Sequence, residues 1–480
     1  MKKTLHIILM AALSVIWACS KTDNTSEQPS VPDKIVITPA EVHFGVDGGT
    51  QAITISAPER PALVSAPAGF SFQPGTYDKE KGRMTATVTA RDNYGCIPME
   101  GEMVFKAGSL TGSLKVTQDA GGDPDAEDPD PGVEPIIPAD EYDAALTNPK
   151  ATREAKNVYE FLLSIAGEKM LSGVQSGGTA NNNERVNQIY QMTGKHPALA
   201  GYDYIFLQYS PTPAGWSWVV NYGDISAAKE QWENNGLVNF MWHWNVPNSK
   251  ADWDNGKKGN FDGYNFYSDK TSFSIKNALT SGTWENDFIL QDIEKVAGYL
   301  KLLQDEGIPV IWRPLHEAAG NYNLYGKTNN AWFWWGRGGA DACKALWKLL
   351  RDKLEGEYGL NNLIWVWTLD ATPGTENEWA SWYPGNDLVD IVGVDIYADD
   401  TDAKERQYKA AADLSAGHKM VTVSECGNIP EPIKCMAAGE KWCWFMTWDL
   451  ESYSLNTAAY WKNVMTSSKV ITRENMPSLK

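Results

Sequence analysis

The sequence predicts an α/β protein in which a (β/α)8 TIM barrel, residues 144–480, follows a small all-β sandwich, residues 33–120. Three observations support this prediction. The C-terminal region repeats apolar runs of strand length between segments of helical period, the N-terminal region repeats short alternating runs, and a proline-rich acidic stretch separates the two. With 480 residues, of which 42% are hydrophobic and 21% charged, the chain is long enough for two or three globular domains.

The charge balance excludes one class of function. The chain has 42 Lys and Arg residues against 61 Asp and Glu residues, a net charge of −19. Nucleic-acid binding relies on clustered positive charge, so no nucleic-acid partner is expected. Twenty of the 21 tryptophans lie between Trp216 and Trp461, so the C-terminal region is rich in flat, amphipathic rings.

The N-terminus has the pattern of an export signal over residues 1–18, with Lys2 and Lys3 followed by an apolar run. Its ending, Ile16-Trp17-Ala18-Cys19, resembles the lipobox of bacterial lipoproteins. That resemblance implies a lipid attached to Cys19, a membrane partner through this anchor, and a position at the outer membrane or cell surface. Residues 19–32 are polar and predict a flexible tether. The alternative is a plain secretory signal with an incidental cysteine.

The remaining five cysteines are an odd number and cannot all pair within one chain: Cys96, Cys343, Cys426, Cys435 and Cys443. We expect packing residues rather than a disulfide framework or a zinc site. The sequence also lacks a His-Glu-x-x-His motif, a Rossmann fingerprint and a calcium loop. No cofactor or metal is therefore predicted.

Residues 33–120 predict the sandwich because apolar and polar residues alternate in short runs, as at 34–38, 51–55, 83–89 and 113–117. The turn Gly48-Gly49-Thr50 and the closing run 116–120 resemble the Bacteroidetes carbohydrate-associated, often N-terminal (BACON) domain. Glycan-binding faces usually display exposed aromatic rings, and this segment has no tryptophan. A spacer is therefore favoured over a glycan-binding module, which stays open.

Residues 121–143 carry nine acidic residues, no Lys or Arg, and several prolines. Such a stretch repels itself and remains solvated, so we expect an extended linker between the two domains.

The barrel prediction rests on eight apolar runs, which are strands buried on both faces in a parallel sheet. These runs are 170–175, 197–204, 236–244, 308–317, 363–368, 389–397, 420–425 and 442–448. Helices are expected between them, for example over 152–166, 224–235, 287–306, 340–357 and 404–417. Gly307 marks the junction between one such helix and the strand that follows it.

Two carboxylates stand out at the C-terminal strand ends, where the chemistry of a TIM barrel is located. Glu317 ends the fourth run and Glu425 the seventh. A buried acid needs either partners or a function, and the structural alternatives are an ion pair with Arg313 for Glu317 and a surface loop for Glu425. Two acids across a tryptophan-lined pocket are typical of glycoside hydrolysis.

Four motifs resemble glycoside hydrolase family 26, which consists chiefly of bacterial endo-β-mannanases. They are Trp312-Arg313-Pro314-Leu315-His316-Glu317, Trp332-Phe333-Trp334-Trp335-Gly336, Trp242-His243-Trp244 and Val423-Ser424-Glu425. The resemblance covers about residues 150–475. It implies a retaining endo-β-1,4-mannanase that cleaves mannan, glucomannan or galactomannan by double displacement.

The resemblance also implies the roles of individual residues. Glu317 would be the general acid/base and Glu425 the nucleophile. His316 and Tyr397 would hydrogen-bond around the nucleophile and the sugar, and His243 would bind sugar hydroxyls. Trp332 and Trp448 would be stacking platforms. Apart from the resemblance, we expect Arg313 to hold Glu317 or the barrel floor in place rather than to touch the sugar.

Several alternatives remain open from the sequence. His243 could be a satisfied core histidine, and a link lengthened by roughly eight residues around 322–330 could reshape the leaving-group side of the cleft. The family also includes hydrolases of β-1,3-xylan and mixed-linkage glucan. A catalytically silent glycan-binding lipoprotein would use the same aromatic cleft.

Overall fold

The computed structural model describes residues 33–46, 48–67, 70–90, 98–119, 142–176, 181–212, 220–320, 322, 331–371 and 376–480. The predicted signal, Cys19, the tether and Cys96 lie outside these residues, as do nearly all of the acidic linker and positions 323–330 of the lengthened link. The chain divides into two compact units, residues 1–133 and residues 134–480.

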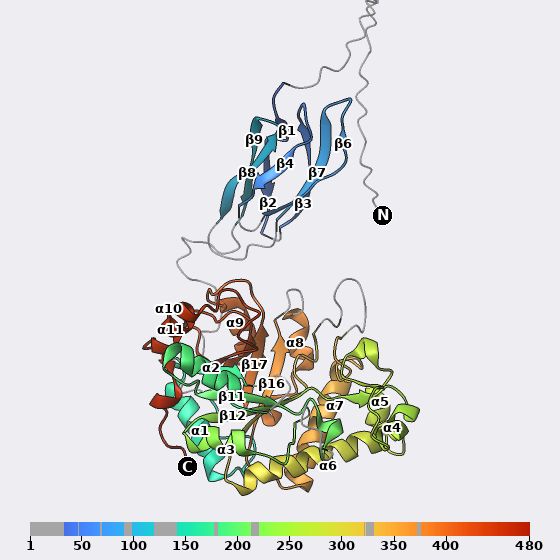
Figure 1. Ribbon diagram of the computed structural model, residues 1–480, viewed down its shortest axis with the longest axis vertical. Helices are drawn as coiled ribbons and strands as arrows, with labels where there is room; N and C mark the ends of the chain where they lie inside the picture. The colour runs from blue at the N-terminus through green and yellow to red at the C-terminus, as the bar shows by residue number, and fades with distance from the viewer. Residues whose placement is uncertain are drawn as a thin grey trace, which may run out of the picture. The chain divides into compact units, whose positions relative to one another are not determined.

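The first unit is a two-sheet β-structure, drawn in blue in Figure 1. One sheet has the order β1-β3-β7-β5, with β6 paired to β7, and the other has the order β2-β9-β8-β4. The strands are β1 Val36–Thr38, β2 Glu41–Phe44, β3 Gly49–Ser56, β4 Ala62–Ser65, β5 Phe70–Gln73, β6 Tyr77–Asp78, β7 Arg83–Ala90, β8 Met99–Ala107 and β9 Leu110–Gln118.

Strand β7 shows why this sequence forms a sheet with one buried face. Met84, Ala86, Val88 and Ala90 are buried, whereas the residues between them face outward. This period of two matches the pleat, so one face of the strand joins the hydrophobic core of the unit. The N-terminal all-β prediction is confirmed.

The second unit is a closed barrel of eight parallel strands, with helices arranged around it (Figure 1). The order is β11-β12-β15-β16-β17-β18-β19-β10, and pairing of β10 with both β11 and β19 closes the barrel. The strands are β10 Met170–Gln175, β11 Leu199–Asp203, β12 Leu237–Trp242, β15 Val310–Pro314, β16 Leu363–Asp370, β17 Ile391–Ile396, β18 Met420–Cys426 and β19 Trp442–Thr447. Every residue in them is buried, which confirms the predicted fold class.

Helices and short strands complete the unit. The α-helices are α1 Arg153–Ile165, α2 Glu184–Thr193, α3 Ser226–Glu233, α4 Lys250–Gly256, α5 Ile275–Ala278, α6 Trp284–Asp305, α7 Ala340–Arg351, α8 Glu376–Trp382, α9 Glu405–Leu414, α10 Pro432–Ala437 and α11 Ala458–Thr466. The short strands are β13 Val246–Pro247, β14 Tyr264–Asn265 and β20 Val470–Ile471. Among the described residues, no helix combines the length and the hydrophobicity needed to cross a bilayer.

Helix boundaries follow local sequence signals. In α1 the Thr152 side chain accepts a hydrogen bond from the Ala155 amide at 3.2 Å, and Ala155, Val158, Leu162 and Ile165 face the core. Helix α6 ends two residues before Gly307, whose φ of 67° only glycine adopts readily.

The segment that leads into the barrel is fixed at the N-terminal ends of the strands. Asp143 pairs with Lys419, directly before β18, at 2.5 Å. The Thr147 hydroxyl donates to Asp390, directly before β17, at 2.7 Å, and the Thr152 amide donates to the Asn361 carbonyl, just before β16. The lead-in segment therefore enters at the base of the barrel.

Candidate active site

Four charged side chains meet inside the C-terminal end of the barrel: Arg313, Glu317, Asp395 and Glu425. The Arg313 guanidinium donates to Asp395 Oδ2 at 2.9 Å and to Glu425 Oε1. One carboxyl oxygen from each of the three acids lies within 4.8 Å of the others. Since all four residues are buried, the arginine offsets part of a negative charge that water does not screen.

The backbone around Glu317 is held in an uncommon conformation. Leu315 and Glu317 follow β15 with φ values of 50° and 52°, a left-handed region that costs a non-glycine residue about 1–2 kcal/mol. The Glu317 amide donates to the Thr368 carbonyl of β16 at 3.1 Å. Such outliers are typical of functional sites, where the surrounding structure imposes them.

Glu317 favours its protonated form. Burial, followed by the charges of Asp395 and Glu425, raises the pKa of its carboxyl well above the usual value. Burial also raises the pKa of Asp395 well above its usual value, and its carboxyl shares a hydrogen bond with Glu317. The site therefore holds a proton at these two neighbouring carboxyls.

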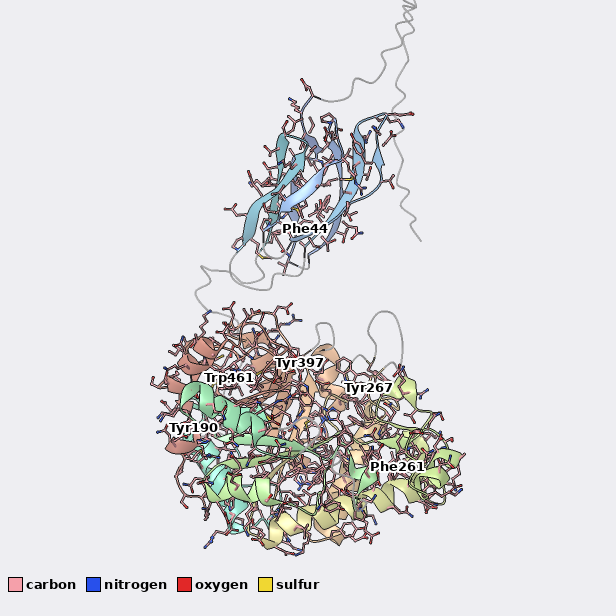
Figure 2. The ribbon with its side chains drawn as sticks, viewed as in Figure 1. Phe44, Tyr190, Phe261, Tyr267, Tyr397 and Trp461 are labelled. Carbon is pink, nitrogen blue, oxygen red and sulfur yellow. The ribbon has the colours of Figure 1, made fainter. Side chains whose placement is uncertain are left out.

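Glu425 is held as a hydrogen-bond acceptor. It lies on β18 opposite Asp395 of β17, where the register of the two strands shifts. Tyr397 donates its hydroxyl to Glu425 Oε2 at 2.6 Å, and Arg313 binds the other carboxyl oxygen. Burial and the Glu425 charge raise the pKa of Tyr397, so its phenol remains a donor. Tyr397, labelled in Figure 2, is 45% exposed, so this site opens to solvent.

Two histidines lie beside these acids. Asp203, at the end of β11, accepts from the His243 amide at 3.0 Å and lies 2.6 Å from its Nδ1. This contact orients the imidazole and leaves Nε2 for another partner. The ring of His316 lies edge-on to that of His243 at 4.6 Å, and burial holds the pKa of His316 well below its usual value. His316 is therefore neutral.

The tryptophans of the motifs have two kinds of position. The indoles of Trp334 and Trp335 are buried and donate to the carbonyls of Trp244 and His316, so they fasten the strand ends. Trp332 and Trp448 are only partly buried. Trp448 lies 5.8 Å from the His243 ring, and the Trp332 ring packs against Gly320, where a Cβ atom would come within 2.4 Å of it.

The structure places the sequence-predicted residues together and changes one expected contact. Arg313 pairs with Glu425 and Asp395, whereas the structural alternative considered from sequence was a pair with Glu317. Asp203, Asp395 and Asp370, whose charge also raises the pKa of Glu317, were not proposed as site residues. The first two end apolar runs, which was a usable signal, and Asp370 was missed because β16 continues two residues past the predicted end.

Glu317, Asp395 and Glu425 are the described residues whose ligand atoms lie close enough to share a metal ion. Arg313 already donates to two of them. The arrangement therefore matches acid/base and nucleophilic chemistry, in which one carboxyl carries a proton and a second, oriented by donors, is an acceptor. The four cysteines that the structure describes are buried and free, and they take no part in this arrangement: Cys343, Cys426, Cys435 and Cys443.

Comparison with known sequences identifies relatives of the barrel unit. Residues 147–475 match the sequence profile of glycosyl hydrolase family 26. The chain is 36% identical over 343 residues to mannan endo-1,4-beta-mannosidase B of Piromyces sp., which covers 69% of this chain and 54% of that protein. It is 35% identical over 347 residues to a mannan endo-1,4-beta-mannosidase of Thermothelomyces thermophilus, covering 71% and 64%. The chain thus spans about half to two thirds of the length of these relatives.

Solved structures give the same relationship. A β-mannanase from a symbiotic protist of the termite Reticulitermes speratus, complexed with a gluco-manno-oligosaccharide, is 35% identical with a TM-score of 0.58, covering 70% of this chain and 98% of that one. The family 26 domain of an endo-β-mannanase/endo-β-glucanase from Prevotella bryantii is 35% identical with a TM-score of 0.62, covering 70% and 99%.

Proposed function

The chain belongs to glycosyl hydrolase family 26, and we propose that it is a retaining endo-β-1,4-mannanase that cleaves mannan, glucomannan or galactomannan. The observation that carries this proposal is the pair Glu317 and Glu425, which approach within 4.8 Å and differ in their hydrogen-bond partners. Retaining glycosidases need about 5–5.5 Å between their carboxyl groups, whereas inverting ones need about 6.5–9.5 Å to admit a water molecule. One oxygen of each carboxyl lies within 4.8 Å of an oxygen of the other, which supports the closer, retaining arrangement.

In the first step Glu425 attacks the anomeric carbon while Glu317 gives its proton to the departing glycosidic oxygen. The products are a covalent glycosyl-enzyme and a shortened chain with a new hydroxyl group. In the second step Glu317, now ionised, takes a proton from water, whose oxygen attacks the same carbon and releases Glu425. The raised pKa of Glu317 supports the first role, because the group must be protonated before each cleavage.

Arg313 and Tyr397 act on the nucleophile. Their donated hydrogen bonds fix both oxygens of Glu425 and disperse its negative charge until attack. His243, oriented by Asp203, is positioned to bind sugar hydroxyls, and the half-buried rings of Trp332 and Trp448 are suited to stacking on pyranose faces.

The choice of polymer rests on the relatives, whose names specify mannan and, for one complex, a gluco-manno-oligosaccharide. We therefore expect a neutral β-mannan chain in the cleft. The test is product analysis of the full chain on β-mannan, glucomannan, β-1,3-xylan and mixed-linkage glucan, with Glu425→Ala as the matched variant. Manno-oligosaccharides from the wild type alone are expected. Products from another glycan only, or binding without cleavage, would overturn the proposal.

We also propose that the chain is a lipoprotein held at the cell surface through Cys19, with the BACON-like sandwich as a spacer. The lipobox-like sequence before Cys19 supports this, as does the lack of tryptophan in the sandwich. Expression of the full chain with Cys19→Ser is expected to release the enzyme from the membrane fraction. A wild-type chain without acyl groups by mass spectrometry would contradict it.

A further inference from the structure

A cavity of about 230 Å³, which we call the outer pocket, lies on the barrel unit apart from the acidic cluster. Its walls come from the segment after β11, from the α4–β14 region and from α6, and they include Gln208, Ser210, Phe261, Tyr264, Gln291 and Asp292. None of the residues assigned to the active site lines it. Figure 2 shows Phe261 well apart from Tyr397, which marks the active site.

Aromatic rings form one wall of this outer pocket. Phe261 and Tyr264 meet edge to face with ring centres 5.2 Å apart. Both are only partly buried, so ring surface remains available to a ligand. Gly256 makes room for Tyr264, because a Cβ atom there would lie 2.2 Å from the tyrosine hydroxyl.

Polar groups without partners form the other wall. Gln208 Oε1 and Ser210 Oγ are buried atoms with no hydrogen-bond partner among the described residues. The Ser210 residue as a whole is only 6% exposed. Asp292, also 6% exposed, accepts from the Trp244 indole through one oxygen at 3.0 Å. Buried polar groups normally find partners, so these atoms indicate a ligand or water that supplies hydroxyl groups.

The charges around the outer pocket favour a neutral ligand. Lys257 Nζ lies 3.6 Å from the centre of the Trp253 ring and 3.4 Å from Asp254. Lys295 Nζ donates to the Leu207 carbonyl at 3.4 Å and stands near the Asp292 carboxyl. Each cation thus has a partner, which leaves no free positive charge among these residues to hold an acidic group.

A hexopyranose has these properties: an apolar face for the rings, hydroxyl groups for the polar atoms, and no charge. We propose that the outer pocket binds one hexose unit of the polysaccharide, as a glycan site separate from the catalytic cleft. This inference rests on the proposed function for the identity of the polymer. Consecutive residues reach the two sites: the Trp244 indole donates to Asp292 of the outer pocket, and the preceding residue, His243, belongs to the active site.

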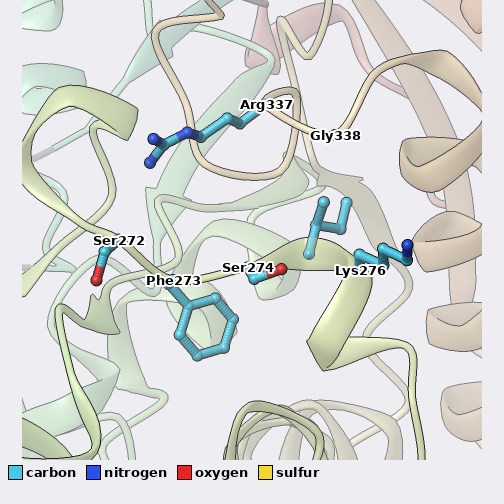
Figure 3. A pocket seen from close by; sticks show the side chains of 7 residues that line it. Ser272, Phe273, Ser274, Lys276, Arg337 and Gly338 are labelled. Carbon is cyan, nitrogen blue, oxygen red and sulfur yellow. The ribbon is translucent and has the colours of Figure 1, made fainter.

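Another cavity, of about 300 Å³ and shown in Figure 3, lacks these features. Its Arg337 already donates to the Ser268 and Thr271 carbonyls, and its aromatic residue, Phe273, is buried in the core. In Figure 3 the side chains of Arg337 and Lys276 extend away from each other. The comparison favours the outer pocket as the glycan site.

The test uses the full chain with Glu425→Ala, which prevents digestion during binding. Phe261→Ala and Gln291→Ala are added separately, with Tyr190→Ala, an exposed aromatic residue on α2, as the matched control. Co-sedimentation with insoluble mannan is expected to weaken about fivefold for Phe261→Ala and less for Gln291→Ala, and to be unchanged for Tyr190→Ala. With Glu425 intact, Phe261→Ala should keep the wild-type kcat/KM on mannotetraose while losing rate on insoluble mannan.

Three outcomes would overturn the inference: unchanged retention of both pocket variants, loss of kcat/KM on mannotetraose in a folded Phe261→Ala chain, or retention on polygalacturonate in place of mannan. Thermal unfolding checks that each variant is folded. If the wild type still releases manno-oligosaccharides, the first outcome removes only the outer pocket and leaves the proposed function standing. If the wild type releases none, the proposed function itself has failed.

Discussion

The two units of this chain differ in how many polar and charged side chains they bury. Among the described residues of the sandwich, the buried polar residue is Gln118, whose amide donates to the Gly45 carbonyl at 3.2 Å. The barrel unit buries many charged residues, among them Arg313 and three acids at its C-terminal end and Asp292 outside that cluster. Burying a charge costs several kcal/mol unless it is paired, so a fold does not accumulate charges in its core without a compensating function. The contrast locates the chemistry in the barrel.

The aromatic residues repeat this contrast. Twelve tryptophans of the barrel unit are among its most completely buried side chains, whereas the sandwich has none. On the sandwich, threonines occupy outward positions instead, and Thr50 and Thr89 pair across β3 and β7 at 2.9 Å. Large rings make the barrel a rigid frame, and two of them, Trp334 and Trp335, fix strand ends next to the acids.

The largest effect is expected where buried charge performs the reaction. Glu317→Gln should lower kcat/KM on mannan by about 10³-fold or more, because the glycosidic oxygen loses its proton donor. An aryl β-mannoside with a leaving group that needs no proton should still form the glycosyl-enzyme in this variant, and should not do so in Glu425→Ala. Burst kinetics and intact mass measure the difference. Equal loss on both substrates would contradict the acid role of Glu317.

The same site gives a pH control. Wild-type kcat/KM should fall as the pH rises through the raised pKa of Glu317, since ionisation removes the acid. Asp395→Asn removes a neighbouring negative charge, which lowers the pKa of Glu317 and moves this alkaline limb to lower pH.

A smaller but still large effect should follow when the buried ion cluster loses its cation. Arg313→Met leaves Asp395 and Glu425 without their shared donor, and should cost the barrel about 3–5 kcal/mol of unfolding free energy. The matched change in the sandwich is His43→Ala, which removes an exposed contact to Asp119 of 3.2 Å and should cost at most about 0.5 kcal/mol. Urea unfolding of both variants measures the two costs; similar values would break the comparison.

The smallest effect concerns a buried acid with no arginine. Burial raises the pKa of Asp292 to about 6 from 3.8, so its contribution to stability is complete below about pH 4 and is lost as the pH rises through about 6. Asp292→Asn keeps an acceptor for the Trp244 indole but does not titrate. Between pH 4 and pH 7, the stability of the wild type should therefore fall relative to this variant by about 2 kcal/mol. A pH-independent difference in urea unfolding would contradict this.

The strands of the barrel could be predicted almost to the residue, because a strand buried on both faces is an uninterrupted apolar run. Strand β10 matches its predicted bounds, and the other seven differ by a few residues at their ends. The helices were harder. Helices were expected between the strands, but bounds were predicted for only some of them, and α2 and α11 are among those that received none.

The site could be predicted to the extent that a residue ends an apolar run. Glu317, Glu425, Tyr397 and His243 follow this rule, and the structure brings them together. Which partner each one takes could not be predicted, because it depends on the register between strands. Asp395 faces Glu425 only through the shift between β17 and β18, and Asp203 reaches His243 across β11 and β12.

The attachment of the lead-in segment at the base of the barrel determines how this domain can meet a long polymer. Residues 143–152 are bound beside the starts of β16, β17 and β18, at the end opposite the acids. A polysaccharide that enters at the mouth of the barrel therefore does not cross residues 143–152, which are bound at the opposite end.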